Sequence, residues 1–227
     1  MTLNVVDRID DLVPLRNVLV SVSDKSGLEL LVPGLRDINP QIRFLSTGGT
    51  FSRLRQILGK HAETCLLQVS DYTGQPETQG GLVKTLDFKI YLGLLTETYN
   101  PDHQADLQRT GALPIDMVVV NLYPFQAAAA QPDATVERAR GNIDIGGPCM
   151  IRAAAKNFIR VASVVDPHDY EQIVNEAAAR KGHTSLALRY TLACKAFDHT
   201  ARYDRAIADW LAQQPVETMR GCYRTAG

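Results

Sequence analysis

Short apolar runs alternate along the chain with stretches in which apolar residues recur every three or four positions. The runs are compact enough to be strands buried on both faces of a sheet. They predict strands at 17–23, 42–46, 64–69, 116–121 and 160–165. Helical spacing follows the first strand at Leu28, Leu31 and Leu35, and it returns up to Leu58 after the second strand. This alternation predicts an α/β domain with a mainly parallel sheet flanked by helices.

Other stretches are less regular. The segment 71–81 is rich in turn-forming residues and predicts a long surface loop, whereas 83–96 fits either a strand or a buried helix. Residues 135–140 predict a short helix, and helical spacing runs from His168 to about Ala212 with a break near Gly182. No linker divides the chain. We therefore expect an N-terminal extension, one domain with C-terminal helices and a weakly structured tail from Pro215, at 1–16, 17–213 and 214–227.

Polar residues follow three of the predicted strands. Because right-handed crossovers bring the carboxyl ends of parallel strands to one edge of the sheet, these residues should lie close together. Ligands bind at that edge in such folds. The residues are Ser21, Ser23 and Lys25 after the first strand, 46–50 after the second, and Asn121 and Tyr123 after the fourth.

Composition excludes several classes of protein. With 24 basic and 25 acidic residues the net charge is −1, which gives no reason to expect nucleic acid or a membrane surface as partner. No apolar run is long enough to span a bilayer, and the N-terminus does not resemble a signal peptide. The four cysteines are scattered without metal-ligand spacing, which fits free thiols in a cytoplasmic protein. We expect neither a metal nor a cofactor.

The segment Ser46-Thr-Gly-Gly-Thr50 joins a predicted strand to a predicted helix. Its glycines allow close backbone approach, and free N–H groups at a helix start can bind a phosphate. Ser46, Gly48, Gly49 and Thr50 are therefore candidate phosphate ligands, with Lys25 as a point charge. The segment is neither a Walker A loop nor GxGxxG, so a nucleoside triphosphate or a dinucleotide is not indicated. A turn that needs glycine only for its geometry is the alternative.

A second glycine pair lies in Asn142-Ile-Asp-Ile-Gly-Gly-Pro, which predicts a loop that turns into a tightly packed helix. Asp144 precedes the glycines and Lys156 follows three alanines. Each charge is tolerable near an interior if the two face each other or a polar ligand. An ordinary helix start with a solvated lysine is the alternative. If Lys84 and Lys156 share one pocket, each lowers the pKa of the other and either can transfer protons near neutrality. Tyr123 can donate a hydrogen bond, and Asn121 can orient an amide.

At these motifs the sequence resembles the IMP cyclohydrolase domain, the N-terminal half of the bifunctional purine-biosynthesis protein PurH. The resemblance covers about residues 17–211. The segments that carry it include Ser21-Val-Ser-Asp-Lys-Ser-Gly27, Ser46-Thr-Gly-Gly-Thr50, Val83-Lys-Thr-Leu86, Val120-Asn-Leu-Tyr-Pro-Phe125, Asn142-Ile-Asp-Ile-Gly-Gly-Pro148, Arg152-Ala-Ala-Ala-Lys-Asn157 and Lys195-Ala-Phe-Asp-His-Thr200.

The resemblance implies a methylglyoxal-synthase-like (MGS-like) three-layer fold, a homodimer, and closure of the ring of 5-formamidoimidazole-4-carboxamide ribotide (FAICAR) to give IMP and water. It places the 5′-phosphate on the serines and Lys25 of the first loop and on 46–50. It implies that Lys84, Tyr123, Asp144 and Lys156 are catalytic, with Lys156 held by Asp144. Asn121, Ile145 and Gly146 would contact the base, and Thr85 would bind beside Lys84.

The chain departs from that family in one motif. The family usually has Arg-Val-Lys-Thr-Leu-His-Pro and a further His, where this chain has Leu82, Asp87, Phe88 and Tyr91. We expect Leu82 and Asp87 within or beside the rim of the pocket, where Asp87 would add negative charge near an anionic substrate, whereas Tyr91 would keep a polar tip. A paralogue acting on a related ribotide and a non-catalytic nucleotide-binding module are therefore alternatives to a cyclohydrolase. The resemblance also predicts a stand-alone copy, with a separate formyltransferase to make its substrate.

Overall fold

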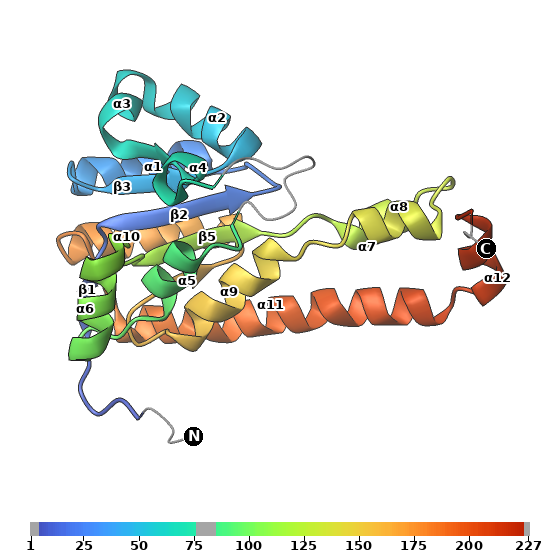
Figure 1. Cartoon of the computed structure of the whole chain (residues 1–227). Helices are drawn as coiled ribbons and strands as arrows, with labels where there is room; N and C mark the ends of the chain where they lie inside the picture. Colours follow the sequence, from blue (N-terminus) through green and yellow to red (C-terminus); the bar gives the residue numbers. More distant parts are fainter. Residues whose placement is uncertain (1–4, 76–84, 225–227) are drawn as a thin grey trace.

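A parallel sheet forms the centre of the chain, in a computed structural model that describes residues 5–75 and 85–224 (Figure 1). In spatial order its strands are β4 (Leu66–Gln68), β3 (Arg43–Ser46), β2 (Asn17–Val22), β5 (Met117–Asn121) and β6 (Ala162–Val164). Every pair is parallel, so all the carboxyl ends lie at one edge of the sheet. The predicted strands and the α/β class are confirmed.

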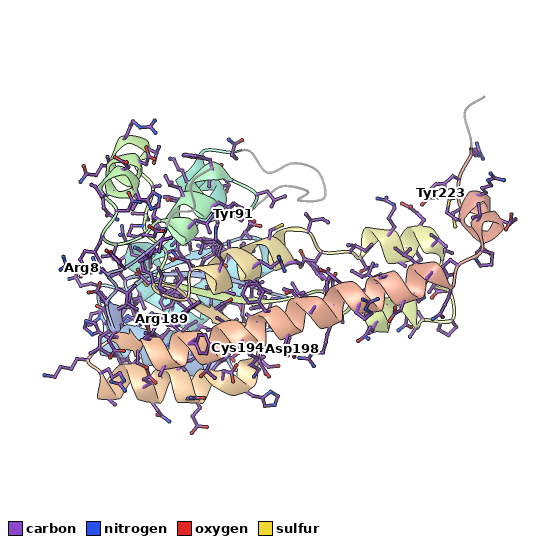
Figure 2. All side chains as sticks on the ribbon, turned by 90° about the horizontal axis from the view of Figure 1, so that it is seen from below. Arg8, Tyr91, Arg189, Cys194, Asp198 and Tyr223 are labelled. Carbon is purple, nitrogen blue, oxygen red and sulfur yellow. The ribbon has the colours of Figure 1, made fainter. Side chains whose placement is uncertain are left out.

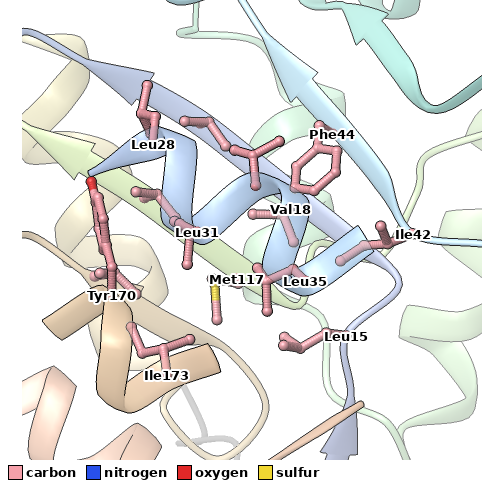
Figure 3. Close-up of a cluster of buried hydrophobic side chains, with 14 of the residues drawn as sticks. Leu15, Val18, Leu28, Leu31, Leu35, Ile42, Phe44, Met117, Tyr170 and Ile173 are labelled. Atoms are coloured by element: carbon pink, nitrogen blue, oxygen red, sulfur yellow. The ribbon is translucent and has the colours of Figure 1, made fainter. Parts of the chain in front are cut away.

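One face of the sheet is covered by α1 (Leu28–Ile38), α2 (Gly48–Leu58), α3 (Ala62–Cys65) and α10 (Tyr170–Ala179). Figure 3 shows the cluster of buried side chains between these layers. Val18 and Met117 point from the strands toward Leu31 and Leu35 of α1 and Ile173 of α10, and none of these side chains is more than 1% exposed. Alternate residues of each strand therefore belong to this core.

The other residues of the strands face α4 (Val69–Thr73), α5 (Phe88–Leu95), α9 (Gly146–Lys156) and the first half of α11 (Leu186–Ala212). Leu19 and Val118 pack in this cluster with Ala154 and Ala155, all fully buried. Small side chains on α9 thus allow close packing against the sheet, as predicted. The ambiguous segment 83–96 forms helix α5 over its second part. Helix α6 (Pro101–Thr110) follows, capped by the Asn100 side chain.

The N-terminal segment is tied to the C-terminal part of the molecule. Strand β1 (Leu12–Pro14) pairs antiparallel with β7 (His183–Ser185), and neither three-residue strand was predicted. Arg189 of α11 is fully buried beneath them (Figure 2). Its guanidinium donates to backbone carbonyls of three segments, those of Asp10, Asp11, Phe158, Ile159 and Thr184. A planar, five-donor group is needed to satisfy so many acceptors at once.

The second half of α11 runs out from the sheet with three short helices, α7 (Phe125–Ala129), α8 (Val136–Gly141) and α12 (Val216–Gly221), in what we call the arm (Figure 1). Helix α8 confirms the predicted helix at 135–140. The prediction of a weakly structured tail is wrong over α12. Short 3-10 turns, η1 (Gly59–His61) and η3 (Pro167–Asp169), complete the described elements. Within the described ranges, no helix combines the length and the apolarity that a membrane span needs.

Candidate active site

A pocket of about 520 Å³ opens at the carboxyl edge of the sheet, where the arm meets the α/β part. It brings together all three polar clusters that the sequence singled out and the loop before α9. Its walls include Ser21, Ser23, Lys25, Thr47, Gly48, Gly49, Thr50, Thr85, Leu86, Asn121, Tyr123, Asn142, Ile143, Asp144, Ile145, Gly146 and Gly147. Most of the predicted site residues therefore share one cavity.

Asn121 holds the loop that carries Ser23 and Lys25. Its side-chain oxygen accepts the N–H groups of Ser23 and Asp24 at 2.7 and 2.8 Å, and its amide nitrogen donates to the Asp24 carbonyl at 2.8 Å. Both lone pairs of the oxygen are thus used within the chain. One N–H of the Asn121 side-chain amide remains for a ligand. Asn121 therefore holds this loop in place, in addition to the ligand contact that the sequence predicts.

Two of the predicted phosphate ligands use their hydroxyl groups within the fold. Ser46 is fully buried and donates to the Val20 carbonyl at 2.8 Å, and it is not part of the pocket wall. Thr50 donates to the Val22 carbonyl at 3.0 Å and accepts the Val22 N–H at 3.1 Å. These hydroxyls join β3 and α2 to β2. The prediction that the Ser46 side chain contacts the ligand is wrong, because the strand directs it to its neighbour in the sheet.

The remaining groups at this end of the pocket suit an anion. Helix α2 begins at Gly48 and Thr47 provides no side-chain cap, so the first backbone N–H groups of the helix are available to a ligand. Lys25 lies beside them, with its Cε 3.9 Å from the position that a Cβ on Gly49 would take. Among the described wall residues, Lys25 is the only lysine or arginine. A helix N-terminus and one ammonium group therefore converge on the same space.

Asp144 is part of the same pocket wall and lies just before the start of α9. Its Oδ1 accepts the Gly147 N–H at 2.9 Å, and its carboxylate also accepts the backbone N–H of Tyr123. Burial raises the pKa of this carboxyl above its ordinary value, and the two hydrogen bonds only partly oppose that shift. A carboxyl with a raised pKa in a pocket is suited to proton transfer.

The second glycine pair is required by close contacts. A Cβ on Gly147 would lie 2.6 Å from both Asp144 Oδ2 and Leu122 Cδ2, and a Cβ on Gly146 would lie 2.6 Å from the Thr85 hydroxyl. Any side chain at either position would push into the groups that line the pocket. The sequence singled out this glycine pair for its backbone freedom, and the structure shows that there is no space for a side chain at either position.

Three large side chains stand exposed around the pocket. Leu86, Tyr123 and Ile145 are 38, 58 and 57% exposed, and all three are part of its wall. Exposed apolar groups around a polar cavity are typical of a binding site for a ligand with a flat apolar face. The sequence did not single out Leu86 as a site residue.

Lys156 does not lie in this pocket. It is exposed at the last position of α9, whereas Asp144 precedes the first position. An 11-residue helix is about 16 Å long, so the expected contact between Asp144 and Lys156 is not formed within one chain. Lys156 shares a side of α9 with Arg152, whose guanidinium lies over the Phe197 ring of α11. The predicted Lys84 and the substituted Leu82 lie outside the described residues.

Two of the residues that depart from the family motif, Asp87 and Tyr91, are not part of the pocket wall. Asp87 is the N-cap of α5, with its carboxylate accepting the Lys89 N–H at 2.8 Å, and it is not part of the pocket wall. Tyr91 packs against the core cluster that includes α9, and its buried hydroxyl interacts with the Cys149 thiol of α9 (Figure 2). Burial raises the pKa of Tyr91. The expected repulsion between Asp87 and an anion in the pocket is not supported by this geometry.

Comparison with known proteins agrees with this fold. Residues 28–149 match the family model of the MGS-like domain, which is more than half of the chain. The chain belongs to the MGS-like domain family. Residues 154–226 match the model of the AICARFT/IMPCHase bienzyme, so the MGS-like domain is followed here by a segment typical of that bienzyme.

The curated relatives that the chain matches include bifunctional purine biosynthesis proteins PurH. The chain is 47% identical to PurH of Synechococcus sp. (strain CC9605) over 204 residues, which is 90% of this chain and 38% of that protein. It is 43% identical to PurH of Magnetococcus marinus over 209 residues, again 38% of that protein. The chain thus spans well under half the length of these relatives. The crystal structure of ForH superposes with a TM-score of 0.73 at 31% identity, covering 86% of this MGS-like chain and 98% of ForH.

Proposed function

We propose that the protein is an IMP cyclohydrolase, which closes the ring of FAICAR to form IMP with loss of water. The observation that carries this proposal is the layout of the pocket. The pocket wall combines an anion site at Lys25 and the start of α2 with two proton-transfer candidates, Tyr123 and Asp144, and with exposed apolar side chains. A ribotide has matching parts, namely a phosphate, a sugar and a planar base. Homology to PurH supports the choice of a purine ribotide.

The 5′-phosphate binds at the start of α2. Gly48 and Gly49, at the uncapped start of the helix, line the pocket together with Lys25, Ser21 and Ser23. The Lys25 ammonium donates to the Ser23 carbonyl at 3.3 Å. Asn121 keeps the Ser23–Asp24 backbone in place for this contact. The base then reaches Tyr123, Ile145 and Gly146, where Thr85 also lines the wall.

Ring closure requires a balanced transfer of two protons. The carboxamide nitrogen attacks the formyl carbon, and a C–N bond forms as that nitrogen loses one proton. The formamido nitrogen loses the other proton when the C=N bond forms. Both protons end on the formyl oxygen, which leaves as water. The Asp144 carboxylate assists the first loss, directly or through a neighbouring amine, and the Tyr123 hydroxyl and the Lys84 ammonium stabilise or protonate the oxygen.

A second copy of the chain supplies Lys156 in this proposal. Lys156 is exposed on an outward side of α9, too far along the helix to reach Asp144 of its own chain. The neighbouring surface of α11 also exposes large rings, with Tyr190 at 56% and Phe197 at 38%. Arg152, Lys156 and these rings form a surface with the aromatic and arginine content that is typical of interfaces. A homodimer across this surface would bring each Lys156 toward the pocket of the other copy.

The test is the absorbance change that accompanies conversion of FAICAR to IMP by the purified protein. We expect turnover well above the uncatalysed cyclisation. A folded sample that shows no such turnover contradicts the proposal. Calorimetry with IMP on the same sample then shows whether an inactive protein still binds the nucleotide. Binding without turnover would favour a nucleotide-binding module or a paralogue that acts on another ribotide.

A further inference from the structure

Both proton-transfer candidates stand on loops that connect the sheet to the arm. Tyr123 lies between β5 and α7, where the chain enters the arm, and Asp144 lies between α8 and α9, where it leaves. The distance between the two side chains therefore depends on how the arm is fixed to the α/β part. Helix α11 is the element that runs through both parts of the molecule (Figure 1).

Aromatic contacts on α11 fix the incoming loop. Phe125 is only 2% exposed, and its ring meets Tyr203 edge-on at 6.5 Å and Trp210 edge-on at 5.9 Å between centroids. The Phe125 N–H donates to the Tyr123 carbonyl at 2.8 Å, which closes the turn at this point. Tyr123 thus stands two residues from a side chain that is held on two sides by α11.

The same Tyr203 fixes the outgoing loop. Its half-buried hydroxyl accepts the backbone N–H of Asp144 at 2.8 Å, and the two residues are 59 positions apart in the sequence. The Asp144 carboxylate in turn accepts the Tyr123 N–H. Tyr203 is not part of the pocket wall, so it contacts the two loops and not a ligand. One side chain of α11 therefore touches both connections at once.

We propose that Tyr203 is a positioning residue, which holds Asp144 at the distance from Tyr123 that the reaction needs. This role rests on the proposed cyclohydrolase function. Without the hydroxyl, a partly buried N–H at Asp144 would lose its acceptor, and the loop would move to find water. Misplacement of a catalytic group by a fraction of an ångström to 1 Å can lower the rate by orders of magnitude while binding is retained.

The variant Tyr203→Phe tests this role, because it keeps the ring against Phe125 and removes only the hydroxyl. We expect kcat for FAICAR to fall about tenfold while KM stays within about twofold. We also expect the acidic limb of the rate profile to move to lower pH, because a loosened Asp144 is better solvated. Tyr99→Phe is the matched control. The Tyr99 hydroxyl donates to Asp10 at 2.6 Å, and neither residue lines the pocket.

A folded Tyr203→Phe protein whose kcat stays within about twofold of the wild-type value would overturn the inference, as would an equal loss in Tyr99→Phe. Hydrogen exchange at the Asp144 amide provides a readout that does not depend on turnover. It should be slow in the unmodified protein and faster in Tyr203→Phe. Fast exchange in the unmodified protein would overturn the inference even if the variant did not fold.

The exchange measurement also separates this inference from the proposed function. If the wild-type protein does not convert FAICAR, the proposed function fails. Faster Asp144 exchange in a folded Tyr203→Phe protein that still binds IMP would support the positioning of this wall by Tyr203. Unchanged exchange at the Asp144 amide would overturn it.

Discussion

The carboxyl of Asp144 is under two opposing influences. Burial favours its neutral form and raises its pKa, whereas the N–H groups of Gly147 and Tyr123 favour the carboxylate. Burial is the larger of the two effects. The ionised form therefore appears at higher pH than in a solvated aspartate, whose pKa is about 3.9. Because proton abstraction needs the ionised form, activity should be lost on the acidic side at a higher pH than an ordinary aspartate would give.

The pH profile of kcat/KM tests this assignment. We expect an acidic limb above pH of about 4 in the wild-type protein, with activity lost as pH falls through the raised pKa of Asp144. Asp144→Asn should lower kcat/KM at least about 100-fold, because it removes the ionisable group. An acidic limb at or below the ordinary value for aspartate would contradict the role of a buried Asp144.

Lys25 provides a separate test of the phosphate end. Lys25→Ala should weaken IMP binding by about 1.5–3 kcal/mol, the magnitude of one charge-assisted hydrogen bond, and should leave inosine binding nearly unchanged. Isothermal calorimetry with both ligands measures the difference. The control is Lys60→Ala, since Lys60 is exposed and lies outside the pocket wall. Equal weakening of nucleotide and nucleoside would place the phosphate elsewhere.

At the scale of elements, Asp87 illustrates how a residue at a family motif can have a different role. It follows the Lys84-Thr85 motif in the sequence, yet its carboxylate caps α5 through the Lys89 N–H. Thr85 and Leu86 still line the pocket, and the next residue, Asp87, already points to the start of α5 instead. The substitution of the family histidine by Asp87 is then explained by helix capping, for which aspartate is among the preferred residues.

This capping role predicts an effect on stability without an effect on affinity. Asp87→Ala should lower the free energy of unfolding by about 0.5–2 kcal/mol, because the first turn of α5 loses its acceptor. Denaturant titration measures the loss. Asp209→Ala is the control, since it removes only an exposed pair with Arg205 on α11. If Asp87→Ala changed IMP affinity by more than about threefold, the result would contradict a role in capping alone and would indicate that Asp87 lies near the bound ligand.

The sequence predicted elements better than it predicted partners of side chains. Strands buried on both faces give compact apolar runs, so β2, β3 and β5 could be located from the order of residues alone. The hydroxyls of Ser46 and Thr50 looked like phosphate ligands because a sequence gives residue types but not directions, and both are used by β2. Tyr203 left no signal, because its contact with Asp144 spans 59 positions and joins a helix to a loop.

The molecule as a whole consists of an α/β part and an arm (Figure 1). The pocket is lined by residues of the α/β part and by Gly141 and Asn142 at the end of α8 in the arm. One chain brings Lys25, Tyr123 and Asp144 to this pocket and leaves Lys156 on an outer surface. A helix length separates Lys156 from Asp144, and no change of side-chain conformation can close a distance of about 16 Å. If both residues serve one reaction, the pocket must be completed by another copy of the chain.

Mixing two inactive variants tests this assembly. We expect Lys156→Ala and Asp144→Asn to be inactive alone. In a mixed dimer, the chain with Lys156→Ala keeps its own Asp144 and receives an intact Lys156 from its partner, so one of the two pockets is complete. Equal mixing gives mixed dimers as half of the population, and activity should therefore return to about a quarter of the wild-type rate. The FAICAR assay after joint refolding measures the recovered activity, with each variant refolded alone as the control.

The alternatives give different results. If Lys156 served its own chain, every pocket in the mixture would contain one defect and no activity would return. If Lys156 had no role, Lys156→Ala alone would already be active. Only return of activity on mixing supports a pocket shared between two copies.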